Sequence, residues 1–211
     1  MDNYEISRDH AQTYFLRFDQ DRLIRTWNLA ADADFLQVRF LGKGYRIARE
    51  TGQITRLETG MQAGFSEVLS IFDFLCHEGS SKFPAGEFAT VNSLHGVPKT
   101  AGVSTDFHTR TAAIFDQKPD ALKRACLAFG GTPVNMGDIG FRFPLFSSLE
   151  VILKFYRSDE DFPAGITLLW DRNLLQYIHY ETVFYIAGFL LDSLCRLFDT
   201  LQNGDTHDGL L

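Results

Sequence analysis

The sequence predicts an α+β protein, with a mostly antiparallel sheet and helices packed against it in a single domain. Two patterns support this prediction: apolar residues alternate with polar ones over short segments, and recur every three or four residues over longer ones. Of the 211 residues, 45% are hydrophobic and 22% are charged, close to the globular average. Since a chain of this length buries roughly 70% of its unfolded surface, we expect residues 1–211 to form one domain.

The first half begins with a helical segment over about residues 1–30, followed by strands. Apolar residues from Ser7 to Trp27 recur at intervals of three and four, as in one or two amphipathic helices. Leu36, Val38 and Phe40 then alternate with polar residues, and a glycine-rich turn follows. With residues 45–49 and 53–57, this segment predicts a three-stranded antiparallel meander.

Two further helices are expected in the middle of the chain. The apolar face of residues 65–76 predicts a helix that ends at Gly79, and residues 119–129 predict another that ends at Gly130-Gly131. Residues 80–108 are rich in Gly, Pro, Ser and Thr and are longer than a simple connection requires. This segment is either a functional loop, such as a lid, or an irregular segment packed over the sheet.

The second half contains two expected strands and a long final helix. The β-branched and aromatic residues at 151–156 and 166–170 predict strands, and an acidic turn at 158–163 separates them. A helix is expected from about 181 to 201, followed by a polar tail at about 202–211. Its longest apolar run, residues 183–191, is far shorter than the roughly 20 residues that cross a bilayer, so it is expected to be a core helix.

Charge and cysteine content narrow the classes of function. The net charge of −7 gives no electrostatic attraction for nucleic acid or an anionic membrane. Cys76, Cys126 and Cys195 are odd in number and widely spaced, so we expect small buried hydrophobic residues in a reducing compartment. The N-terminus lacks the basic and apolar stretches of a secretory signal. A cytoplasmic protein with no nucleic-acid or membrane partner is therefore expected.

A series of short motifs resembles a known family. In chain order these motifs are Phe40-Leu41-Gly42-Lys43-Gly44-Tyr45-Arg46-Ile47, Phe129-Gly130-Gly131, Gly137-Asp138, Phe143-Pro144-Leu145-Phe146, Asp159-Glu160-Asp161-Phe162-Pro163-Ala164, Leu169-Trp170-Asp171 and Tyr180-Glu181-Thr182. Across most of residues 10–195 their order resembles an uncharacterised prokaryotic family, domain of unknown function 3786.

The resemblance implies no established activity. Members of that family are frequent in anaerobes, and some carry a cysteine-rich iron–sulfur segment of the type seen in corrinoid methyl-transfer proteins. The resemblance therefore implies a link to anaerobic corrinoid or iron–sulfur metabolism, with a cofactor protein as partner. This chain lacks the cysteine-rich segment, which argues against a direct electron-transfer or corrinoid role.

One polar stretch gathers several titratable groups and supplies the candidate ligand-binding residues. These are Asp138, Asp159, Glu160, Asp161, Asp171, His179 and Glu181. Carboxylates with an imidazole hold divalent cations or act as acid/base pairs. The structural alternatives are a solvated turn at 159–161, a turn at 173–175 capped by Asp171, a half-buried His179, and a Glu181 that interacts with helix N-terminal amides.

Other catalytic patterns are missing from the sequence. There is no Gly-x-Ser-x-Gly, and Gly42-Lys43-Gly44 sits in an expected hairpin turn rather than ahead of a phosphate-binding helix. Twenty phenylalanines offer stacking partners for a planar cofactor, but core packing also explains them. The sequence thus identifies no cofactor and no oligomeric state.

Two hypotheses follow for the function. The first is a non-catalytic module that binds a small ligand or a protein partner near residue 138 and residues 158–181. The alternative is a metal-dependent hydrolase that uses Asp138, Asp159, Glu160 and His179 as ligands or proton-transfer groups. The alternative requires those four side chains to converge within about 5 Å on a concave surface.

Overall fold

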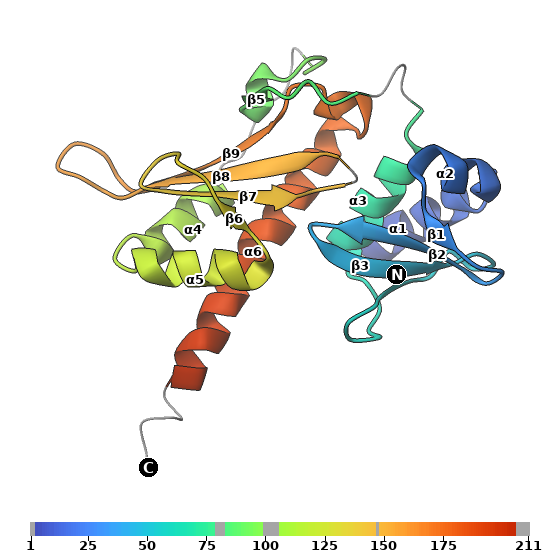
Figure 1. The fold of residues 1–211 in the computed structure, drawn as a ribbon, viewed down its shortest axis with the longest axis horizontal. Helices are drawn as coiled ribbons and strands as arrows, with labels where there is room; N and C mark the ends of the chain where they lie inside the picture. The colour runs from blue at the N-terminus through green and yellow to red at the C-terminus, as the bar shows by residue number, and fades with distance from the viewer. Residues whose placement is uncertain (1–2, 79–82, 99–105, 147, 206–211) are drawn as a thin grey trace.

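The computed structural model describes residues 3–78, 83–98, 106–146 and 148–205. Over these ranges it has six α-helices and two antiparallel sheets, and helices pack against strands in both halves (Figure 1). The predicted α+β class is confirmed.

The first sheet lies in the N-terminal half and has the strand order β1-β2-β3-β4. The elements of this half are α1 (Asn3–Phe15), α2 (Gln20–Trp27), β1 (Ala30–Ala31), β2 (Phe35–Phe40), β3 (Lys43–Ala48), β4 (Ile54–Arg56) and α3 (Phe65–Cys76). In β2, Leu36, Val38 and Phe40 are buried while Gln37 and Arg39 are exposed, as strand alternation requires. The predicted meander is confirmed, with β1 as an additional edge strand.

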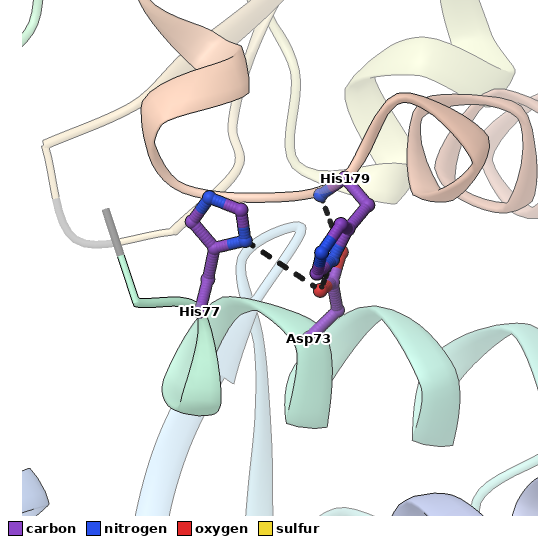
Figure 2. A group of neighbouring side chains, drawn as sticks. All are labelled: Asp73, His77 and His179. Atoms are coloured by element: carbon purple, nitrogen blue, oxygen red, sulfur yellow. Dashed lines mark hydrogen bonds and ion pairs between the residues drawn. The ribbon is translucent and has the colours of Figure 1, made fainter. Parts of the chain in front are cut away.

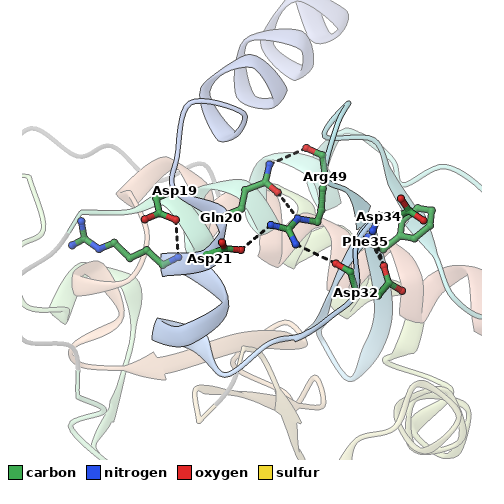
Figure 3. Close-up of polar contacts among 8 residues, drawn as sticks. Asp19, Gln20, Asp21, Asp32, Asp34, Phe35 and Arg49 are labelled. Carbon is green, nitrogen blue, oxygen red and sulfur yellow. Dashed lines mark hydrogen bonds and ion pairs between the residues drawn. The ribbon is translucent and has the colours of Figure 1, made fainter.

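A polar network fastens α2 to the first sheet (Figure 3). The Arg49 guanidinium donates to the Gln20 side chain, the Asp21 carboxylate and the Asp32 carbonyl at 2.8–3.1 Å. Asp19 caps the helix by accepting a hydrogen bond from an amide three residues later. The helical entry segment is therefore held against the turns of the sheet.

The second sheet lies in the C-terminal half and has the order β5-β9-β8-β7-β6. The elements here are β5 (Phe88–Ala89), the 3₁₀ helix η1 (Val91–Ser93), α4 (Asp106–Phe115), α5 (Pro119–Phe129), β6 (Thr132–Pro133), β7 (Ile139–Pro144), β8 (Glu150–Tyr156), β9 (Gly165–Asp171), the 3₁₀ helix η2 (Leu174–Gln176) and α6 (Tyr180–Asp205). The strands predicted at 151–156 and 166–170 are confirmed as β8 and β9. Helix α5 ends as predicted, since Gly130 adopts a left-handed φ of 98°.

Three details differ from the sequence-based expectations. Helix α3 ends earlier than Gly79, because His77 already has the extended conformation of a C-cap, and Gly79 itself lies outside the described residues. The expected loop at 80–108 contains β5, η1 and the start of α4, while 79–82 and 99–105 are also outside the described ranges. Helix α6 continues to Asp205, so the first part of the expected polar tail is helical.

Helix α6 joins the two halves, because it packs on α3 as well as on α4 and α5 (Figure 1). Buried hydrophobic residues from both sheets belong to one cluster. At its centre Phe146 stacks on Phe40 and Phe74, with ring centroids 4.9 and 4.2 Å apart. None of the described helices combines the length and apolarity that crossing a membrane requires.

Candidate functional site

Two histidines and a carboxylate meet where the end of α3 approaches the start of α6 (Figure 2). Asp73 lies in the last turn of α3 and His77 follows four residues later, so both project from the same side of the helix. His179 directly precedes Tyr180, the first residue of α6. The three side chains therefore come from the two halves of the protein.

The potential ligand atoms of these residues lie close together. One ligand atom from each of Asp73, His77 and His179 lies within 4.8 Å of the others. The Asp73 Oδ1 atom is 2.5 Å from His179 Nδ1 and 3.9 Å from His77 Nδ1. The two imidazole centroids are 4.6 Å apart with the rings nearly perpendicular, at 81°.

Asp73 also has a structural role in this arrangement. Its Oδ2 atom accepts hydrogen bonds from the His179 amide at 2.8 Å and from the Thr182 hydroxyl at 2.5 Å. These donors belong to the first turn of α6 and the residue before it, where backbone amides lack helical partners. Asp73 therefore caps α6 from a neighbouring helix and ties α3 to it.

The exposure of the three side chains leaves one side of the group open to solvent. The Asp73 and His77 side chains are each 13% exposed, whereas the His179 side chain is 68% exposed. Asp73 and His77 are thus held by packing on α3, and His179 lies at the surface. An ion could reach this site without unfolding of either helix.

The donor set fits a divalent transition metal. Imidazole nitrogens suit Zn²⁺ and Fe²⁺, and two histidines with one carboxylate recur in catalytic zinc sites and non-haem iron sites. Ligand bonds of about 2.1 Å place neighbouring ligand atoms roughly 3.0–3.4 Å apart. The observed separations are 2.5 Å for the hydrogen bond between Asp73 and His179 and 3.9 Å between Asp73 and His77, so coordination of one ion by all three residues requires their side chains to rearrange.

The acidic residues predicted from the sequence lie elsewhere or have structural partners. Asp138 accepts a hydrogen bond from the Arg157 amide at 2.8 Å, which places it beside the β8–β9 turn. Within that turn Asp159 accepts from the amides of Asp161 and Phe162. Asp138 thus lies beside the acidic turn, and the hydrogen bonds there are those of a solvated hairpin.

Asp171 lies at the other end of β9 and is buried. Its carboxylate accepts hydrogen bonds from the amides of Ala85, Gly86 and Asn173 at 2.8–2.9 Å, so the predicted cap of the following turn is observed. The carboxylate also anchors the segment before β5. Burial of the Tyr177 hydroxyl and, to a smaller extent, the negative charge of Asp171 raise the pKa of Tyr177.

Among the sequence-predicted residues, only His179 belongs to the Asp73–His77–His179 group. Glu181 is exposed in the first turn of α6, as expected for a residue near helix amides. Asp138 and Asp159 lie at the β8–β9 turn, whereas the polar partner of His179 is Asp73. The described residues therefore do not place Asp138, Asp159, Glu160 and His179 in one site.

Sequence reasoning does not identify Asp73 and His77, because the apolar period of the surrounding segment predicts only a helix face. Their spacing of four residues is a recognisable signal for two ligands on one side of a helix. The third ligand is 106 positions away from Asp73, so local spacing could not identify it.

A second buried polar centre is structural. Glu67 of α3 is 1% exposed, and its carboxylate accepts from the Tyr45 hydroxyl, the Gly64 amide and both Nε and Nη2 of Arg56. Burial and the Glu67 charge together raise the pKa of Tyr45 well above its ordinary range. The three side chains fasten α3 to β3 and β4.

Comparison with known proteins gives one match. A family model described as Domain of unknown function (DUF3786) matches residues 21–193. No curated protein and no solved structure matches the chain. The matched range includes Asp73, His77 and His179.

Proposed function

The chain belongs to the DUF3786 family, whose function is unknown, and we propose from the geometry that it binds a divalent transition-metal ion through Asp73, His77 and His179. The observation that carries this proposal is the convergence of two imidazoles and a carboxylate within 4.8 Å. The proposal narrows the small-ligand-binding module expected from the sequence to a metal-binding module.

Zn²⁺ and Fe²⁺ fit these ligands better than Mg²⁺ or Ca²⁺, which prefer oxygen donors. Cys76, Cys126 and Cys195 are not part of the group, so it provides no thiolate ligand for a cluster. Three protein ligands leave at least one coordination position for water, a small molecule or a side chain of a partner protein. The exposure of the His179 side chain supports an open position that faces the solvent.

Metal binding at this site would also couple the two halves of the protein. Asp73 and His77 are fixed to α3, while His179 is fixed to the start of α6. An ion bonded to all three would stabilise the contact between these helices. Because binding only to the folded state stabilises it by mass action, saturation at 100 times Kd would add about 2.7 kcal/mol to the free energy of unfolding.

The test is a zinc titration of metal-free protein against a chromophoric chelator. We expect one equivalent to bind the unaltered chain, and His77→Ala and His179→Ala each to weaken that binding at least tenfold. His10→Ala is the matched control, because His10 is an exposed histidine on α1 outside the group. Equal zinc affinity in all four proteins would overturn the proposal.

Hydrolysis is a second candidate function, favoured by the specific observation that, among the described residues, three side chains that could bind a metal form the group. Zinc sites with three protein ligands carry a water whose pKa falls to about 7, which makes it a nucleophile at neutral pH. The zinc-loaded protein should then cleave bis(4-nitrophenyl) phosphate or 4-nitrophenyl acetate, and His179→Ala should abolish the cleavage. Zinc binding without turnover of either ester would support the non-catalytic module.

A further inference from the structure

One edge of the second sheet is only partly covered by a neighbouring strand. Strand β5 pairs with β9 only at its last two residues, whereas β8 pairs with β9 from Gly165 to Trp170 (Figure 1). After Ala89 the chain leaves the sheet and enters η1. In the part of the chain that the structure describes, no strand therefore pairs with residues 165–169 of β9 on the side of β5.

Two residues of this edge direct their backbone groups away from β8. Consecutive residues of a strand point their N–H and C=O groups to alternate sides. The Arg172 amide donates to the Glu87 carbonyl at 2.9 Å and so faces β5. By alternation Trp170, Leu168 and Ile166 face the same side, but β5 ends opposite Trp170. Among the described residues, the N–H and C=O groups of Leu168 and Ile166 thus form an unpaired edge, which is a template for pairing with another chain.

A groove with a volume of about 390 Å³ follows this edge. It is lined by residues 164–168 and Trp170, by residues 90–92 around the start of η1, and by residues 108–109 of α4. No Asp, Glu, Lys or Arg is among the described residues that line it. An uncharged groove beside an unpaired strand suits an extended peptide, which pairs through its backbone and places alternate side chains in pockets.

The residues of this edge lack the features that keep strand edges from pairing. Edge strands are commonly protected by charged side chains or by proline. The opposite edge of the same sheet is β6, which contains Pro133, and proline has no N–H to donate. Residues 165–169 read Gly-Ile-Thr-Leu-Leu, with no proline and no charge. The sheet is thus protected against an added strand at β6 and unprotected along β9.

The register argues against a second copy of this chain as the occupant. Two β9 edges that paired antiparallel about Thr167 would place Ile166 of one copy opposite Leu168 of the other. Trp170 of one copy would then lie opposite Ala164 of the other. Because β5 is paired with Trp170 on that same side, β5 would occupy the place of Ala164. A single extended segment carries no such neighbouring strand and avoids this clash.

The turn that precedes β9 favours a basic segment. Asp159, Glu160 and Asp161 lie in this turn with one cation, Arg157, and all four residues are exposed. A segment antiparallel to β9 leaves the groove at the N-terminal end of β9, so the residues that follow lead toward this turn. Basic side chains there would meet a net negative charge, which favours association with a basic partner.

We propose that the open edge of β9 binds an extended segment of a partner protein as an added antiparallel strand. The backbone of the segment pairs with Ile166 and Leu168, and its uncharged β-branched residues lie in the groove. Basic residues at its C-terminal end face the acidic turn. None of the metal-binding candidates lines the groove, so this proposal is independent of metal binding.

The test is fluorescence polarisation of the fluorescein-labelled peptide Thr-Val-Thr-Val-Thr-Lys-Lys with the full chain in the presence of a chelator. We expect saturable binding, weakened at least tenfold when both lysines are replaced by glutamates. N-methylation of one peptide residue at a time should weaken binding at least tenfold at alternate central residues and leave it unchanged at those between, because every second amide of an added strand faces β9. No binding at millimolar peptide, equal effects at all central residues, or equal binding of the glutamate peptide would overturn the proposal.

A pair of protein variants tests the position of the site. Asn92 is exposed and lines the groove, so Asn92→Trp should fill part of it and weaken peptide binding at least tenfold without disturbing the core. Ser93 is exposed and does not line the groove, so Ser93→Trp should bind as the unaltered chain does. Undiminished binding in Asn92→Trp would refute the site. A dimer of the unaltered chain in sedimentation velocity that is lost in Asn92→Trp would identify a second copy as the occupant and overturn the proposed partner.

Discussion

Replacing Asp73 with alanine should destabilise the metal-free protein by about 2–4 kcal/mol. The carboxylate accepts hydrogen bonds from the His179 amide and from the hydroxyl of Thr182, which is 5% exposed. Loss of a helix cap costs about 1 kcal/mol, and a buried hydroxyl left without its acceptor costs about 1–3 kcal/mol more. The sum is a large share of the roughly 5–15 kcal/mol that stabilises a typical domain.

The assay is urea unfolding with a chelator present, so that no bound ion contributes. Thr182→Val removes the hydroxyl itself and should cost about 1 kcal/mol, less than Asp73→Ala. Asp192→Ala, an exposed site on α6, should change the free energy of unfolding by less than about 0.5 kcal/mol. If Asp73→Ala falls within the range of that control, Asp73 does not tie α3 to α6 and the structural half of the reasoning is refuted.

Three further predictions concern stability. Glu67→Ala should lower the free energy of unfolding in urea by about 3–5 kcal/mol, because it leaves the Tyr45 hydroxyl and the Arg56 guanidinium without the buried carboxylate that they bind. Glu58→Ala, at an exposed site, should cost little, and equal losses in the two variants would contradict the buried network. Burial lowers the pKa of His108, so the unfolded chain takes up this proton at higher pH and stability should fall as pH drops below about 6.5. His108→Gln should flatten that decline between about pH 7 and 5, and parallel curves would count against it. Gly137→Ala should destabilise the protein by more than about 1 kcal/mol, since φ is 65° and the added Cβ would lie 2.6 Å from a carbonyl oxygen. In Gly188→Ala on α6 the added Cβ meets no neighbour, so this variant should be more stable by up to about 1 kcal/mol. Thermal melts should therefore show a lower Tm for the first variant and a higher Tm for the second.

Local patterns predicted the elements whose burial follows a regular period. The alternation in β2 and the apolar face of α3 both appear in the structure with nearly the expected bounds. Strand β7 was missed because it contains Gly140 and ends at Pro144, two residues that weaken a strand pattern. In the fold Gly140 is required by close packing, since a Cβ there would lie 2.6 Å from the Met136 carbonyl oxygen.

The candidate site was only partly predictable for a different reason. His179 was identified from its own stretch of sequence, together with neighbouring carboxylates that the fold uses for turns and caps. Its partner Asp73 comes from a distant helix, and the packing of α6 on α3 is a tertiary event that no local spacing encodes. The resemblance to the family placed the chain correctly but supplied no site residues.

X-ray absorption spectroscopy at the zinc edge of protein loaded with one equivalent of Zn²⁺ tests the central proposal most directly. The proposal predicts a first shell of nitrogen and oxygen at about 2.0–2.1 Å with the outer-shell scattering of two imidazoles, reduced to one imidazole in His77→Ala. A first shell that contains sulfur, or one without imidazole scattering, would contradict binding by Asp73, His77 and His179.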